Sequence, residues 1–242
     1  MRLTISFILC LAMALTLLGG SAMAQQTTSD TDTASSDISE AITGEDELVK
    51  ARGKFKETWV NPDADFTQYN KLYLWGAVFE FRDVGPAKKS RSRMSTGRTS
   101  EYGISDTGRA KFQTIVSEAF TQEMERSKRF KVVEDISPDT LIVRGSVLDI
   151  VSNVPPELSG RSEIYLSNIG EATMTIDLID AETGIIQARV SERRKIQPPG
   201  GGRIDTFSTP TNSVTVTADV KRWARSSASR LRSELEKAQK GR

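Results

Sequence analysis

The stretch DTLIVRGSVLDIV at 139–151 constrains the fold more than any other part of the chain. Apolar residues occupy four of its odd positions, Leu141, Val143, Val147 and Val151, and between Ile142 and Ile150 only Arg144 and Ser146 interrupt the even ones. A strand with this pattern is covered on both faces, as in the middle of a sheet. Gly145 weakens the strand slightly and predicts the close approach of a helix backbone at that point. We therefore expect a sheet with this strand near its centre.

Four further segments have strand patterns: 71–81, 130–134, 170–180 and a segment that starts at Ile186. A predicted hairpin at 180–184 joins the last two segments. In 170–180 one face is expected to face solvent because it carries Thr173, Thr175 and Asp177. Apolar residues at three- and four-residue spacing predict helices at about 106–129 and 213–239. The fold class expected is α/β, a two-layer sandwich with an antiparallel or mixed sheet and both helices packed on one face.

The strand at 71–81 is rich in aromatic residues. Simple alternation places Leu72, Leu74 and Val78 on one face and the aromatic side chains on the other, namely Tyr73, Trp75, Phe79 and Phe81. Tyr73, Trp75 and Phe79 could form an exposed binding face, although burial under a neighbouring segment is the more common arrangement. Trp75 is therefore a candidate binding residue.

The N-terminal region predicts export. Arg2 precedes an apolar run, and the small residues that follow end in an Ala-x-Ala site, so we expect a signal peptide at 1–24 with cleavage between Ala24 and Gln25. Residues 25–47 carry seven acids and no base, which is typical of a disordered acidic linker. A single α/β domain is expected at 48–242, in a protein that is soluble in the periplasm or secreted, without a transmembrane segment after cleavage.

The sequence lacks the residues that several kinds of catalytic and metal-binding site require. The chain has no histidine, and its one cysteine, Cys10, lies in the signal peptide, which removes Ser-His-Asp and Cys-His nucleophiles and the common zinc sites. Asn61, Asp63 and Asp65 imitate the start of a calcium loop, but the later ligand positions are wrong and a turn or cap is favoured. We predict no catalytic residue, no cofactor and no metal site.

The segment 82–105 has no periodicity and contains a basic cluster formed by Lys88, Lys89, Arg91 and Arg93, with Arg98 nearby. A solvated loop is the ordinary interpretation, and contact with an acidic polymer or an anionic lipid is the alternative. The whole chain has a net charge of only +1, so binding to nucleic acid is not expected. The four basic residues join Trp75 as candidate binding residues, and the expected partner is another envelope protein or an acidic envelope polymer.

Three stretches of the chain resemble a family of bacterial envelope proteins known as domain of unknown function (DUF) 3313. They are WVNPDADFTQYNKLYLW at 59–75, FKVVEDISPDTLIVRGSVLDI at 130–150 and ATMTIDLIDAETGIIQARV at 172–190. Members are mostly predicted lipoproteins, but no cysteine follows the signal here, so the resemblance does not extend to lipid anchoring. The order of elements also resembles periplasmic accessory modules such as the curli secretion channel subunit, and a shared fold does not give function.

These observations favour a non-catalytic periplasmic or envelope accessory protein. A hydrolase of envelope glycan that uses two carboxyl groups is one alternative, because such pairs cannot be read from sequence spacing. A self-assembling structural component of the envelope is another. If a partner binds, we expect it to use the sheet face opposite the helices together with the basic loop.

Overall fold

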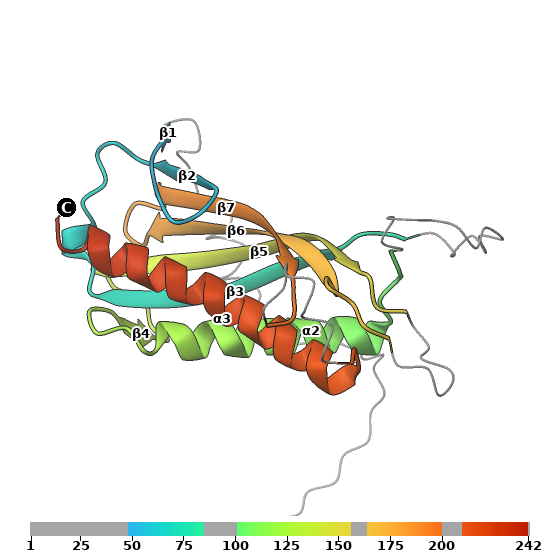
Figure 1. Ribbon diagram of the computed structural model, residues 1–242. Coiled ribbons are helices and arrows are strands. Elements are labelled where there is room, and N and C mark those ends of the chain that lie inside the picture. Colours follow the sequence, from blue (N-terminus) through green and yellow to red (C-terminus); the bar gives the residue numbers. More distant parts are fainter. Residues whose placement is uncertain (1–47, 85–100, 156–163, 200–209, 242) are drawn as a thin grey trace, which may run out of the picture.

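The computed structural model of the protein describes residues 48–84, 101–155, 164–199 and 210–241 (Figure 1). In chain order the elements are β1 (Val49–Lys50), β2 (Glu57–Val60), η2 (Phe66–Gln68), β3 (Lys71–Phe81), α2 (Asp106–Met124), β4 (Lys131–Val133), β5 (Thr140–Ser152), β6 (Gly170–Asp180), β7 (Ile186–Ile196) and α3 (Ser213–Ala238).

The strands form one sheet with the order β1-β2-β7-β6-β5-β3-β4. The pairs β3–β4 and β3–β5 are parallel, and the other neighbours are antiparallel, so the sheet is mixed. The predicted central strand is β5, which is paired along its length with β3 on one side and β6 on the other. The hairpin between β6 and β7 is confirmed, and Gly184 takes a φ of 70° in its turn.

Both helices lie on the same side of the sheet (Figure 1). Their buried side chains share one core with the inward residues of the long strands; this core includes Phe112, Val116, Val143, Met174, Ile176, Trp223 and Leu231. Asn212 caps α3 with a capping box that also involves Thr215, and Ser105 caps α2. The two-layer α/β sandwich with helices on one face is therefore confirmed.

The assignment of faces in β3 was wrong beyond Trp75. Gly76 has a φ of 89° and the register with β5 shifts between Leu74 and Ala77, which marks a β-bulge. The extra residue reverses the alternation, so Phe79 and Phe81 pack in the helix-covered core against Phe112. Tyr73, Trp75 and Val78 face the other side of the sheet, where Val78 is 63% exposed.

Other expectations also needed correction. Gly145 meets the bulge of β3 and not a helix, because a Cβ there would lie 3.2 Å from the Cβ of Ala77. The first helix ends at Met124 and not near residue 129, since the Ser127 hydroxyl accepts hydrogen bonds from the backbone N–H groups of Arg129 and Phe130 and supports a turn. The short strands β1 and β2 were not predicted.

The predicted signal peptide, the acidic linker and the basic cluster lie outside the described residues. In the parts of the chain that are described, no helix combines the length and the apolar character needed to cross a membrane.

Candidate functional site

The face of the sheet opposite the helices, called the open face below, is covered by no described helix (Figure 1). On β6 it carries four polar outward residues, Glu171, Thr173, Thr175 and Asp177. Their partners on β7 in the antiparallel register are Lys195, Arg193, Ser191 and Arg189. Because directly opposed residues point to the same side of a sheet, this part of the open face is a polar surface.

Asp177 is held between two guanidinium groups from the strands on either side of β6. Arg144 of β5 donates from Nη2 to Oδ2 of Asp177 at 2.8 Å, and Arg189 of β7 donates from Nε to Oδ1 at 2.5 Å. The three residues face one another in the register, and Asp177 is only 6% exposed. Two cations therefore share the carboxylate of Asp177.

A tryptophan lies at each end of this row. Trp59 of β2 is the register partner of Arg189, and Trp75 of β3 follows Leu74, the partner of Val143, so it lies alongside Arg144. Both indoles are half-buried. The order across five strands is thus Trp59, Arg189, Asp177, Arg144 and Trp75.

Trp75 is partly covered by its own chain. Together with Tyr73 and Leu48 it packs against a small apolar cluster on the open face, formed by Ile142, Ile179 and Ile186. Burial under a neighbouring segment therefore applies in part to Tyr73 and Trp75. Phe79 was expected on the same face, but the bulge in β3 turns it into the helix-covered core.

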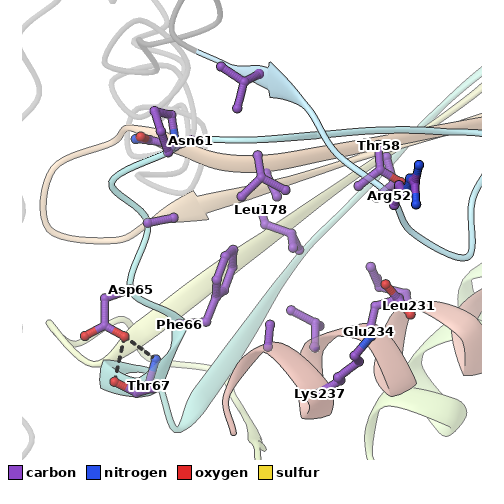
Figure 2. A pocket seen from close by; sticks show the side chains of 18 of the residues that line it. Arg52, Thr58, Asn61, Asp65, Phe66, Thr67, Leu178, Leu231, Glu234 and Lys237 are labelled. Carbon is purple, nitrogen blue, oxygen red and sulfur yellow. Dashed lines mark hydrogen bonds between the residues drawn. The ribbon is translucent and has the colours of Figure 1, made fainter. Parts of the chain in front are cut away.

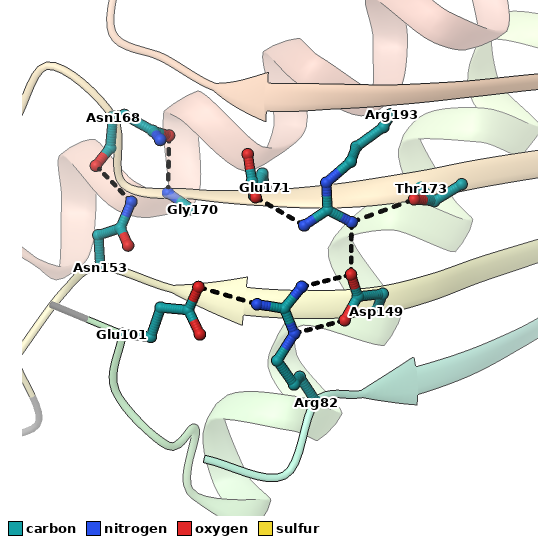
Figure 3. A network of polar contacts seen from close by, with 9 residues as sticks. All are labelled: Arg82, Glu101, Asp149, Asn153, Asn168, Gly170, Glu171, Thr173 and Arg193. Carbon is teal, nitrogen blue, oxygen red and sulfur yellow. Dashed lines mark hydrogen bonds and ion pairs between the residues drawn. The ribbon is translucent and has the colours of Figure 1, made fainter. Parts of the chain in front are cut away.

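A second polar network lies at the other end of the open face (Figure 3). Asp149 stands at a bulge in β5 with a φ of 53° and accepts hydrogen bonds from Arg82 and Arg193. Arg193 also reaches Glu171 at 2.6 Å, and Arg82 reaches Glu101 at 2.8 Å. Hydrogen bonds from Arg82 and then from Arg193 hold the pKa of Asp149 below its usual value.

Asp149 and Glu171 form a carboxylate pair, since Arg193 gives one of its two terminal nitrogens to each, at 2.6 Å. Glycoside cleavage by two carboxyl groups needs one that stays protonated, with a raised pKa. Asp149 has a lowered pKa, and the other shifted carboxyl groups in the described ranges, those of Asp65, Asp139, Asp180 and Glu236, are also lowered. The pair is therefore arranged as an ion-paired network, and no observation favours its use as a general acid.

The turn interpretation of the segment with alternating polar residues is confirmed. Asn61 Oδ1 accepts the backbone N–H of Asp63 at 2.9 Å, and Asp65 caps η2 by accepting the backbone N–H of Thr67 at 2.8 Å. Among the described residues no group of three or more acidic side chains is close enough together to hold a metal ion.

Sequence reasoning placed Thr173, Thr175 and Asp177 on the open face, and the structure confirms their position. It missed the residues that engage them. Arg189 and Arg193 were detectable as the polar half of the alternation in β7, whereas Trp59 lies in a strand that gave no pattern. The predicted binding residues Lys88, Lys89, Arg91 and Arg93 are outside the described ranges.

Comparison with known proteins identifies a family. The family model "Protein of unknown function (DUF3313)" matches residues 42–229, which is most of the chain. No curated protein matches.

Among solved structures, a neuraminyllactose-binding hemagglutinin homolog from Helicobacter pylori is 12% identical with a TM-score of 0.37, covering 73% of this chain and 95% of that one. The PelC dodecamer from Paraburkholderia phytofirmans is 7% identical with a TM-score of 0.33, covering 76% and 96%. At these scores neither similarity bears on function.

Proposed function

We propose, from the premise that this chain belongs to the DUF3313 family of proteins of unknown function, that it is a non-catalytic accessory protein of the bacterial envelope. In this proposal it is exported by the signal peptide at 1–24 and binds an acidic partner, either an envelope protein or an envelope polymer. The binding surface is the open face together with the basic cluster at residues 88–93.

One observation supports this function above the others. The row from Trp59 to Trp75 crosses five strands on a sheet face that no described helix covers, and it combines two half-buried indoles with a charged centre. Val78 adds an exposed apolar side chain beside the row. Aromatic residues and arginine are enriched at protein interfaces because they combine large contact area with polar contacts.

The arginines of the open face alone do not favour an acidic partner, and the unmatched positive charge comes from the basic cluster. The four arginines on the face, at 82, 144, 189 and 193, are matched by four acids, at 101, 149, 171 and 177. The loop contributes Lys88, Lys89, Arg91 and Arg93 without an acid among residues 85–100. Arg82 and Glu101, which flank this segment in the sequence, form an ion pair with each other, and Arg82 also pairs with Asp149.

Retention on an immobilised polyanion tests the charge part of the proposal. The variant with Lys88, Lys89, Arg91 and Arg93 changed to Glu should lose retention on polyaspartate at low salt, since close opposite charges attract most when screening is weak. A matched variant reverses four exposed lysines elsewhere, Lys111, Lys128, Lys131 and Lys240, with the same change in net charge. The proposal requires that the loop variant loses more retention than the matched variant. Equal retention of the two variants would show that net charge alone determines binding to polyaspartate.

A further inference from the structure

A groove of about 450 Å³ lies on the helix-covered side of the sheet, between the C-terminal half of α3 and the β1–β2 ribbon (Figure 2). Its volume is within the range of small-molecule sites, about 300–1,000 Å³. The groove is on the opposite side of the sheet from the open face, so a ligand site in it is independent of the proposed function.

The floor and walls of the groove are apolar. Leu178 of β6 and Ala188 and Val190 of β7 form the floor, and Leu231, Leu235 and Ala238 are the apolar side chains of the wall on α3. Phe66 closes the end that lies near Asn61 and Asp65 (Figure 2). A ligand in this groove therefore gains affinity mainly by removing apolar surface from water.

The floor of the groove offers few hydrogen-bonding groups. Of the buried polar side-chain atoms of the lining, only Thr58 Oγ1 lacks a partner in the described part of the chain, and the floor strands have their backbone groups paired within the sheet. A peptide brings one N–H and one C=O per residue that need partners when buried. An alkyl chain brings none, so the groove suits an alkyl chain better than a peptide.

Charged side chains lie around the groove. The backbone N–H of Ala51 donates to the carbonyl of Thr58 at 2.8 Å. This bond brings the neighbouring Arg52 close to Thr58, and the two residues line the same end of the groove (Figure 2). On α3, Glu234 lies across from them, and Lys237 lies further toward the C-terminal end of the helix (Figure 2). In the described ranges neither Arg52 nor Lys237 forms an ion pair, so the groove is lined by two cations without an acidic partner and by the carboxylate of Glu234.

The acid at the other end is already engaged. Asp65 accepts hydrogen bonds from both the backbone N–H and the hydroxyl of Thr67, at 2.8 and 2.6 Å, and these bonds keep its pKa low. An anionic group is therefore better accommodated at the Arg52 end, and the chain attached to it runs over the apolar floor toward Phe66.

We propose that this groove binds one long-chain carboxylate, with the alkyl chain on Leu178, Ala188 and Val190 and the carboxylate near Arg52 and Lys237. Binding of dodecanoate to the purified full chain, measured by calorimetry below the micelle concentration, tests the proposal. One molecule should bind per chain. From octanoate to dodecanoate the affinity should rise about fourfold for each methylene that is buried.

Three charge variants give a signature that a purely apolar site lacks. Arg52→Gln and Lys237→Gln should each weaken dodecanoate binding about two- to fivefold, because exposed ion pairs contribute little individually. Glu234→Gln should strengthen it by a similar factor, since it removes a like charge. Dodecanol, the matched neutral ligand, should show none of these changes.

A blocking variant tests the location. Ala64→Phe introduces a large side chain into the groove from a half-buried loop position, whereas Ala110→Phe makes the same change at an exposed position on α2. Ala64→Phe should abolish dodecanoate binding while Ala110→Phe leaves it intact, with unchanged thermal unfolding of both apo proteins as the folding control. Binding that survives Ala64→Phe, binding that ignores all three charge changes, or no binding at all would overturn the proposal.

Discussion

The phenol of Tyr69 donates a hydrogen bond of 2.5 Å to Oδ2 of Asp180, joining the segment before β3 to the hairpin between β6 and β7. Both residues are buried, and the other oxygen of Asp180 accepts from the backbone N–H groups of Glu182 and Thr183 and from the Thr183 hydroxyl. One carboxylate thus shapes the hairpin and attaches it to the chain 111 residues earlier.

Tyr69→Phe should lower the free energy of unfolding by about 1–3 kcal/mol, because it leaves a buried carboxylate oxygen without this donor. Urea unfolding at neutral pH measures the loss. Tyr73→Phe is the matched control, since it removes the same hydroxyl from a half-buried position on the open face. Equal losses in the two variants would show that the bond to Asp180 has no special contribution.

Asp180 should also make the fold sensitive to acid. Burial alone raises the pKa of its carboxyl, but the hydrogen bonds from Tyr69 and Thr183 outweigh burial and leave the pKa below its ordinary value. The unfolded chain, with an Asp pKa of about 3.9, therefore takes up its proton first as the pH falls. The stabilisation is fully present above about pH 5 and is lost as the pH falls through the folded pKa.

Asp180→Asn should accordingly be less stable than the parent protein at neutral pH, and the difference should shrink between about pH 5 and pH 2. Denaturant unfolding across this range gives the comparison. A difference that stays constant with pH would contradict the lowered pKa.

Gly76 should not tolerate a side chain although there is space for one. A Cβ at this position meets no atom within 4 Å, but its φ of 89° is strained for any other residue. Gly76→Ala should cost about 1–2 kcal/mol of unfolding free energy. Gly103→Ala, where a Cβ also has open space and φ is not in the strained range, should be neutral or slightly stabilising. If both substitutions lowered the free energy of unfolding, the positive φ at the bulge would not be the cause of the loss.

The central position of β5 predicts a large cavity cost. Leu141 is fully buried between β3 and β6, so Leu141→Ala should lower the unfolding free energy by about 2–5 kcal/mol. Val78→Ala, on the open face, should change it by no more than about 0.5 kcal/mol. A loss below about 0.5 kcal/mol at Leu141 would mean that β5 is not central to the core.

The long elements could be predicted because their signals are repeated along many residues. The alternation of β6 gives both its span and its wet face, and the apolar stripe of α3 gives its bounds nearly to the residue. β1 and β2 have two and four residues, too few for a periodic signal, and their places are set by pairing, of β2 with β7 and of β1 with β2.

The face assignment in β3 failed for a local reason. One extra residue at a bulge moves every later side chain to the other face. The bulge lies at Gly76, and a single glycine leaves no periodic signal in the sequence from which a bulge could be predicted. The clamp on Asp177 likewise depends on register: Arg144 and Arg189 are visible as polar residues in their strands, but only pairing shows that both oppose the same carboxylate.

Site-specific photocrosslinking in intact cells tests the binding role of the open face most directly. A photoreactive residue in place of Val78 lies on the open face, and one in place of Glu118, exposed on α2, is the control on the helix side. The proposed function predicts an adduct with a distinct envelope component from position 78 that is absent from position 118 and diminished by reversing the four loop charges. Adducts of equal yield from both positions, or only a homodimer from position 78, would contradict it.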